Sequence, residues 1–130
     1  MIVVDASALV AILMDEPERD LFLAALSRSA SGLSPVGYWE AATRLEQHRG
    51  QPGVLDLDQL IANFDVRIVA ADEAIAKGAA DAQRKFGKRT PAKLNLGDCF
   101  AYALARELDA PLLYKGDDFT RTDVKSVLPD

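Results

Sequence analysis

The chain has 130 residues, of which 49% are hydrophobic and 27% are charged, a composition typical of a globular protein rather than a disordered or fibrous one. This length suits one compact domain, so we expect residues 1–130 to form a single domain with its own core. The formal net charge of −5 argues against an ordinary nucleic-acid-binding protein, which usually presents a basic surface, unless bound cations offset the acids.

The cysteine content and the N-terminal segment favour a protein of the reducing cytoplasm. Cys99 is the only cysteine, so the chain cannot form an intrachain disulfide. The apolar residues 1–14 invite comparison with a signal peptide, but they lack a basic leading segment and include Asp5. They are also too short to span a bilayer, so we expect no membrane insertion. We interpret them as a buried strand at 2–4 that runs into a helix.

The rest of the chain alternates between helical and extended patterns. After a first helix that Ser7 can cap, apolar residues at helical spacing predict helices over about 18–29, 36–49, 57–64, 72–86 and 97–108. Short apolar runs predict strands at 66–70 and 112–114, with weaker signals within 29–35 and 124–128. Such alternation implies right-handed crossovers and a central, mostly parallel sheet that is covered on both faces. The fold class is therefore α/β, a three-layer α/β/α sandwich.

Acidic residues recur where this topology gathers segments at one edge of the sheet. In a parallel sheet all strands end at the same edge, and the helices that run back begin there. Asp5 follows one expected strand, Asp117 and Asp118 follow another, and Glu40 and Asp98 lie early in two of the helices. We expect the fold to bring these carboxylates together.

A cluster of carboxylates predicts a particular chemistry. Carboxylates repel one another unless protons or cations neutralise them. Oxygen ligands without histidine or thiolate partners favour Mg²⁺ or Mn²⁺ over zinc. Such a cation activates water and offsets charge on phosphate oxygens during phosphoryl chemistry. Each acid alone also has an ordinary explanation, as a helix cap, a first-turn charge or a turn residue, so the prediction rests on their joint placement.

Four segments around these positions span nearly the whole chain: IVVDASALVAILMDEPE, YWEA, LNLGDCFAYALARELDAPLLYKGDDF and TDV. In these segments the sequence resembles the PIN-domain ribonucleases that act as toxins of VapBC toxin–antitoxin pairs. The resemblance implies a PIN-like form of the α/β/α sandwich and a cytoplasmic endoribonuclease that depends on Mg²⁺, with Mn²⁺ as a substitute. It also implies an RNA substrate, a VapB-like antitoxin whose tail blocks the active site, and a homodimer.

The resemblance also assigns roles to the acids. Asp5 and Asp98 are expected to hold the principal metal ion, while Glu40 and a fourth acid in the GDDF segment hold a second ion or orient the attacking water. Many relatives separate the two acids of this segment by one residue, whereas here they are adjacent. We prefer Asp117 as the fourth acid because it follows the strand sooner, and Asp118 remains the alternative.

Two further groups are expected to assist these acids. Ser7 and Thr120 can support the carboxylates through their hydroxyls, since they lie near Asp5 and the GDDF segment. The run RKFGKRTPAK contains no acid and is expected to contact the RNA backbone through Arg84, Lys85, Lys88, Arg89 and Lys93.

Three alternative functions share parts of this pattern. A haloacid-dehalogenase-type phosphatase needs a second acid two residues after the first, and here that position is Ser7. A response-regulator-like receiver domain would suit Lys115 after a strand, but it requires paired acids after the first strand, where Asp5 stands alone. A non-enzymatic α/β interaction module does not explain an acid at every motif position.

Overall fold

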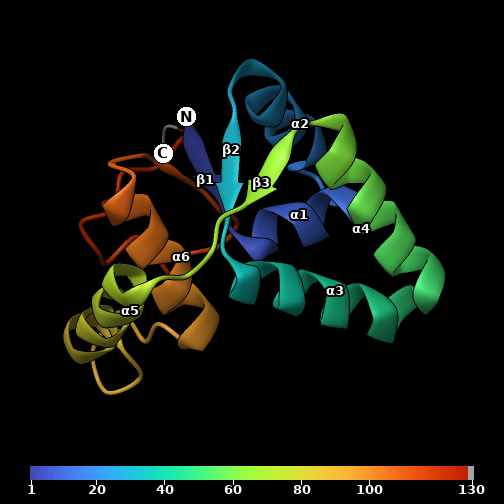
Figure 1. Ribbon diagram of the computed structural model, residues 1–130. Coiled ribbons are helices and arrows are strands. Elements are labelled where there is room, and N and C mark those ends of the chain that lie inside the picture. The colour runs from blue at the N-terminus through green and yellow to red at the C-terminus, as the bar shows by residue number, and fades with distance from the viewer. Residues whose placement is uncertain (129–130) are drawn as a thin grey trace.

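A computed structural model describes residues 1–128, and in it four parallel strands form one sheet between two groups of helices (Figure 1). Along the sheet the strands lie in the order β3-β2-β1-β4, and every neighbouring pair is parallel. The strands are β1 (Ile2–Val4), β2 (Ser31–Leu33), β3 (Val66–Ile68) and β4 (Leu112–Leu113). The first strand of the chain is therefore central, with β2 and β4 on its two sides.

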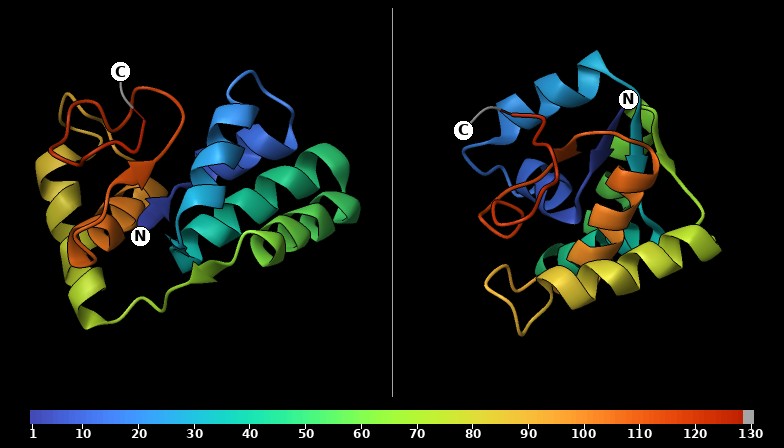
Figure 2. Two further views of the ribbon diagram at one scale, coloured as in Figure 1. Left: turned by 90° about the horizontal axis from the view of Figure 1, so that it is seen from above. Right: turned by 90° about the vertical axis from the view of Figure 1, so that its left-hand side faces the viewer.

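Helices cover both faces of this sheet, which confirms the three-layer sandwich. One face packs against α1 to α4 and the other against α5 and α6, and the two groups lie on opposite sides of the sheet in the view from above (Figure 2). The helices are α1 (Ala6–Leu13), α2 (Arg19–Arg28), α3 (Pro35–Arg49), α4 (Gln51–Asn63), α5 (Glu73–Phe86) and α6 (Leu96–Glu107). Within residues 1–128, no helix is both long enough and apolar enough to cross a membrane.

The side chains of β1 alternate between the two halves of the core. Ile2 and Val4 pack with the helices α1 to α4, whereas Val3 packs with α5 and α6. All three side chains are buried, because a central parallel strand is covered on both faces. β1 therefore ends in a fixed place, and so does Asp5, the next residue along the chain.

The start of α1 differs from the expectation. Asp5, not Ser7, is the N-cap, because its carboxylate accepts a hydrogen bond from the Ser7 backbone N–H at 3.0 Å. The first candidate acid therefore also closes a helix end, so capping and a catalytic role do not exclude each other at this position.

Two other boundaries were mispredicted. α4 begins at Gln51 rather than near residue 57, because Gly50 (φ 67°) turns the chain and Pro52 lies in the first turn, where a missing N–H leaves no helical bond unmade. The strand expected at 124–128 is reduced to one parallel bridge between Leu112 and Ser126.

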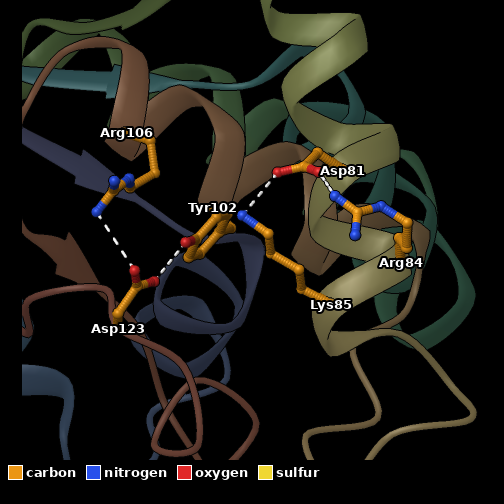
Figure 3. Close-up of polar contacts among 6 residues, drawn as sticks. All are labelled: Asp81, Arg84, Lys85, Tyr102, Arg106 and Asp123. Carbon is orange, nitrogen blue, oxygen red and sulfur yellow. Dashed lines mark hydrogen bonds and ion pairs between the residues drawn. The ribbon is translucent and has the colours of Figure 1, made fainter.

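The segment after β4 is attached to α6 through Asp123 (Figure 3). The Tyr102 hydroxyl donates a hydrogen bond to Asp123 Oδ1, and the Arg106 guanidinium lies 3.5 Å from Asp123 Oδ2. The hydrogen bond from Tyr102, more than the nearby Arg106 charge, lowers the pKa of Asp123. The same segment carries Asp118, so this attachment restricts the movement of a candidate acid.

Replacing the hydroxyl that makes this attachment should weaken the fold in a pH-dependent way. Tyr102→Phe should lower the free energy of unfolding by about 0.5–1 kcal/mol at neutral pH, the range for a hydrogen bond to a half-exposed partner. A lowered pKa means that Asp123 stabilises the fold above its unfolded pKa of about 3.9 and loses this contribution as the pH falls through its folded pKa. Urea unfolding at neutral and acidic pH should therefore show a smaller difference in acid, and an equal difference at both would contradict a charge-assisted bond.

Candidate active site

Carboxylates from four parts of the chain face one small pocket at the carboxyl edge of the sheet. The pocket has a volume of about 80 Å³, and its lining includes Asp5 after β1, Glu40 of α3, Asp98 of α6 and Asp118 after β4. Asp5 and Asp98 are only 5% and 7% exposed, whereas Glu40 is partly buried and Asp118 is exposed. The structure thus brings Asp5, Glu40 and Asp98 together, as the parallel topology predicts.

Of the two adjacent acids after β4, Asp118 lines the pocket and Asp117 does not. The Asp117 side chain is exposed, and its backbone carbonyl accepts hydrogen bonds from the Thr120 N–H at 3.1 Å and the Thr120 hydroxyl at 2.7 Å. The chain turns through Gly116 (φ 99°) before the two acids, so their order along the sequence does not decide which one faces the pocket. The geometry therefore favours Asp118 over Asp117, and it gives Thr120 a role within the turn rather than beside an acid.

Ser7 connects Asp5 to the segment that carries Asp118. The Ser7 hydroxyl donates a hydrogen bond of 2.6 Å to Asp5 Oδ2 and accepts one of 3.0 Å from the Lys115 backbone N–H. Since the Ser7 backbone N–H also donates to Oδ2, neither of these two bonds to the carboxylate uses Oδ1. Ser7 itself lines the pocket, and its hydroxyl holds Asp5 in position there.

A capping box holds Asp98 at the start of α6. Asp98 Oδ2 accepts a hydrogen bond from the Asn95 backbone N–H at 3.1 Å, and Asn95 Oδ1 accepts one from the Asp98 N–H at 2.8 Å. This reciprocal pairing stabilises a helix N-terminus and fixes the direction of the aspartate at the same time. Asp98 is therefore both a helix-terminus charge and a wall of the pocket.

Glu40 reaches the pocket because the neighbouring position of α6 has no side chain. A Cβ atom placed on Gly97 would lie 1.7 Å from Glu40 Oε1, far inside van der Waals contact. The glycine thus leaves the space that the Glu40 carboxylate occupies. α3 brings Glu40 there because Ser34, directly after β2, caps the helix by accepting a hydrogen bond from the Val36 N–H at 3.1 Å.

Burial and like charge both oppose ionisation of these acids. Burial, and after it the nearby charges of Asp5 and Asp98, raise the pKa of Glu40 to about 7, while Arg44 acts to lower it. Burial likewise raises the pKa of Asp98 to about 6, against the hydrogen bond from Asn95. Burial also raises the pKa of Asp5, in spite of its bonds to Ser7. The fold therefore holds these carboxylates together in an environment that favours their protonation or the binding of a cation.

The residues around the pocket fit a hard divalent cation. The titratable ligands they offer are carboxylates, and Gly97 leaves the room that the Glu40 oxygens fill. Within residues 1–128, no three Asp, Glu, His or Cys side chains lie close enough together to coordinate one ion as they stand. Coordination would therefore require side-chain rotation, for which the partly buried Glu40 and the exposed Asp118 have the freedom.

Two cationic residues of the pocket were not predicted as parts of the site. Arg44 lines it from α3, one helical turn after Glu40, and this spacing of four residues was the signal that could have identified it. Lys115 also lines the pocket, and its ammonium group contacts Glu16 and lies 3.3 Å from Glu18 Oε1. The contacts of Lys115 join residues that are far apart in the sequence, so no local sequence pattern predicts them.

The predicted basic run separates into two parts. Arg84 and Lys85 both pair with Asp81, which lies one turn earlier on α5, and the Lys85–Asp81 distance is 3.0 Å (Figure 3). The hydrogen bonds from Lys85 and Arg84 lower the pKa of Asp81. Part of the charge of the run is therefore offset by an acid just outside it. Lys88 and Arg89 lie in the following loop and are exposed, and the Lys88 charge lowers the pKa of Asp98 against the raising effect of burial.

Comparison with known proteins gives consistent matches. A family model described as PIN domain matches residues 2–125. A protein named ribonuclease VapC from Mycolicibacterium smegmatis is 44% identical over 127 residues, covering 96% of this chain and 98% of that protein. Ribonuclease VapC30 of Mycobacterium tuberculosis is 43% identical over 127 residues, covering 96% and 97%.

Solved structures show the same fold. The crystal structure of Mycobacterium tuberculosis VapC20, described as a toxin that cleaves the sarcin–ricin loop, has a TM-score of 0.81 at 15% identity and covers 99% of this chain and 100% of that one. A toxin–antitoxin complex from Klebsiella pneumoniae has a TM-score of 0.71 at 18% identity, covering 95% and 93%. At these identities the two structures are similar to this chain in fold alone.

Filling the space beside Glu40 should separate stability from activity. Gly97→Ala should displace the Glu40 carboxylate, and a shift of this size in a reacting group lowers turnover by on the order of 100-fold. The fold should keep its stability or gain up to about 1 kcal/mol, because the displaced atoms end a flexible side chain and alanine is the better helix former. Thermal melts in chelator and RNA-cleavage rates would test both, and a variant that is fully active would contradict the proposed position of Glu40.

Proposed function

The chain belongs to the PIN-domain family and is a VapC-type endoribonuclease, and from this premise we propose that the pocket lined by Asp5, Glu40, Asp98 and Asp118 is its active site. The observation that carries the proposal is the approach of four carboxylates from separate elements to one pocket. The receiver-domain and interaction-module alternatives are not supported. The relatives that are 43–44% identical to this chain, over nearly their whole length, are named as ribonucleases.

Dependence on a divalent metal is typical of PIN-domain ribonucleases, and we propose Mg²⁺ as the ion, with Mn²⁺ as a substitute. Asp5 and Asp98 suit the principal ion because hydrogen bonds and burial already restrain both carboxylates. Glu40 and Asp118 are less restrained, so we assign them to a second ion or to the attacking water. A bound cation would supply a Lewis acid for a phosphate oxygen and lower the pKa of a bound water.

The surrounding side chains prepare the carboxylates for this role. Hydrogen bonds from Ser7 to Asp5 and from Asn95 to Asp98 favour the ionised forms, which are the forms that bind a cation. Glu40 has a pKa of about 7 in the metal-free protein, so at neutral pH its carboxyl can hold or release a proton beside the site of reaction. The Arg44 charge opposes further protonation of Glu40.

The family also indicates the partners. RNA is the substrate and an antitoxin is the protein partner of VapC-type ribonucleases, and we propose a VapB-like antitoxin that blocks the pocket. We further propose one catalytic domain over residues 1–130 and a homodimer, for which the 64% exposed Trp39 on α3 offers an apolar surface. An RNA substrate and a lone, buried Cys99 fit action in the reducing cytoplasm.

Removing single carboxylates should separate the site from neighbouring surface acids. Asp98→Asn and Asp118→Asn should each lower RNA cleavage in Mg²⁺ by more than the roughly 10–100-fold loss caused by removing a group that only supports a ligand. Asp117→Asn removes the same charge from the adjacent acid outside the pocket and should keep wild-type activity. Cleavage of total cellular RNA, with Mg²⁺ or with chelator, measures this, and full activity in excess chelator would contradict a metal mechanism.

The same variants give a second measurement by thermal melting. Without metal, Asp98→Asn should be at least as stable as the wild type, because it relieves the repulsion among buried carboxylates. Mg²⁺ should raise the melting temperature of the wild type and of Asp117→Asn, and raise that of Asp98→Asn much less. If Asp98→Asn is clearly destabilised in chelator and Mg²⁺ shifts none of the proteins, Asp98 acts only as a helix-terminus charge.

The split of the basic run predicts which of its residues bind RNA. Lys88→Ala with Arg89→Ala should weaken RNA binding and reduce the slope of log affinity against log salt by about 0.7 per lost phosphate contact. Arg84→Ala with Lys85→Ala removes the same charge from residues that both pair with Asp81, and should have a smaller effect. Equal salt slopes for the two double variants would indicate that pairing with Asp81 does not decide which of these residues contact RNA.

A further inference from the structure

The two cationic side chains of the acid pocket are held differently. The Lys115 ammonium contacts Glu16 and lies 3.3 Å from Glu18 Oε1, a buried oxygen that has no hydrogen-bond partner within the described residues. These contacts connect the segment after β4 to the turn between α1 and α2. The positive charge of Lys115 is therefore already neutralised by two carboxylates outside the pocket.

Arg44 lies on the pocket-facing side of α3 and is exposed. Among the ion pairs and side-chain hydrogen bonds formed within residues 1–128, none involves its guanidinium. It lies one turn after Glu40 on the same helix, and both side chains line the pocket. The guanidinium thus stands near the carboxylates with its N–H donors available to a further acceptor.

A phosphodiester is the acceptor that suits this arrangement. A guanidinium binds two oxygens of one phosphate at once, and this geometry is more specific than a point charge. The pocket wall presents four carboxylates, which repel RNA, and Lys115 is already paired with Glu16 and Glu18. A free cation at the rim would offset that repulsion.

We propose that Arg44 binds a backbone phosphate of the RNA at the rim of the acid pocket, whereas Lys115 holds the segment that carries Asp118 and does not contact RNA. This inference rests on the proposed function. Arg44 would then be the residue that positions the RNA backbone across the carboxylates.

The test compares Arg44→Met with Arg28→Met. Arg28 ends α2 just before β2, at the edge of the sheet opposite the pocket, and its replacement removes the same single charge. All binding variants also carry Asp98→Asn to prevent cleavage, and the probe is a fluorescent single-stranded RNA of mixed sequence. Arg44→Met should weaken binding by about tenfold and reduce the salt slope by about 0.7, as expected for one lost phosphate contact. Arg28→Met should match the parent.

Two further variants complete the comparison. Arg44→Lys keeps the charge without the forked donor and should bind RNA with intermediate affinity. Lys115→Met should lower the melting temperature and leave the salt slope unchanged. The inference would be overturned if Arg44→Met and Arg28→Met bound RNA with equal affinity and equal salt slope. It would also be overturned if Lys115→Met reduced the salt slope and Arg44→Met did not. An otherwise wild-type protein that cleaves no RNA in Mg²⁺ would overturn the proposed function, and the inference with it.

Discussion

Asp5, Glu40, Asp98 and Asp118 share one small pocket although burial and like charge oppose their ionisation. Ordinary features of chain geometry keep them there: the ends of parallel strands, two helix caps and the missing side chain of Gly97. The helix termini contribute N–H donors that partly offset the repulsion. A cation would offset the remainder, so the fold carries a local instability that ligand binding can relieve.

The same balance explains how a chain of net charge −5 can act on RNA. Part of the acidic charge is concentrated at the pocket, where a cation would reverse its effect on a phosphate. Some of the basic residues form ion pairs within the protein. Asp81 pairs with two basic residues of α5, and Glu16 and Glu18 pair with Lys115. Net charge therefore says little about the substrate, and the arrangement of paired and unpaired cations around the pocket says more.

Much of the fold could be predicted from periodicity, because the buried β1 and the amphipathic helices carry strong patterns of spacing. The parallel topology by itself predicts that Asp5, Glu40 and Asp98 lie at one edge of the sheet. The choice between Asp117 and Asp118 could not be made in this way, because it depends on the turn at Gly116 and on which side chain that turn directs inward. The contact between Glu40 and Gly97 joins two helices that are distant in the sequence, so it too required the structure. The pairing of Arg84 and Lys85 with Asp81 could have been predicted from the sequence, since these residues lie three and four positions after Asp81 on one helix.

The most direct test of the shared pocket is the number of protons released when a cation binds. Glu40 and Asp98, with pKa values of about 7 and about 6 in the metal-free protein, are partly protonated near neutral pH, and a divalent cation must displace those protons. Calorimetric titration with Mg²⁺ or Mn²⁺ at about pH 6.5, in buffers of different ionisation enthalpy, should show release of at least about one proton per protein, with any proton held by Asp5 in addition. Binding without proton release, or no binding, would contradict a cation site built from these carboxylates.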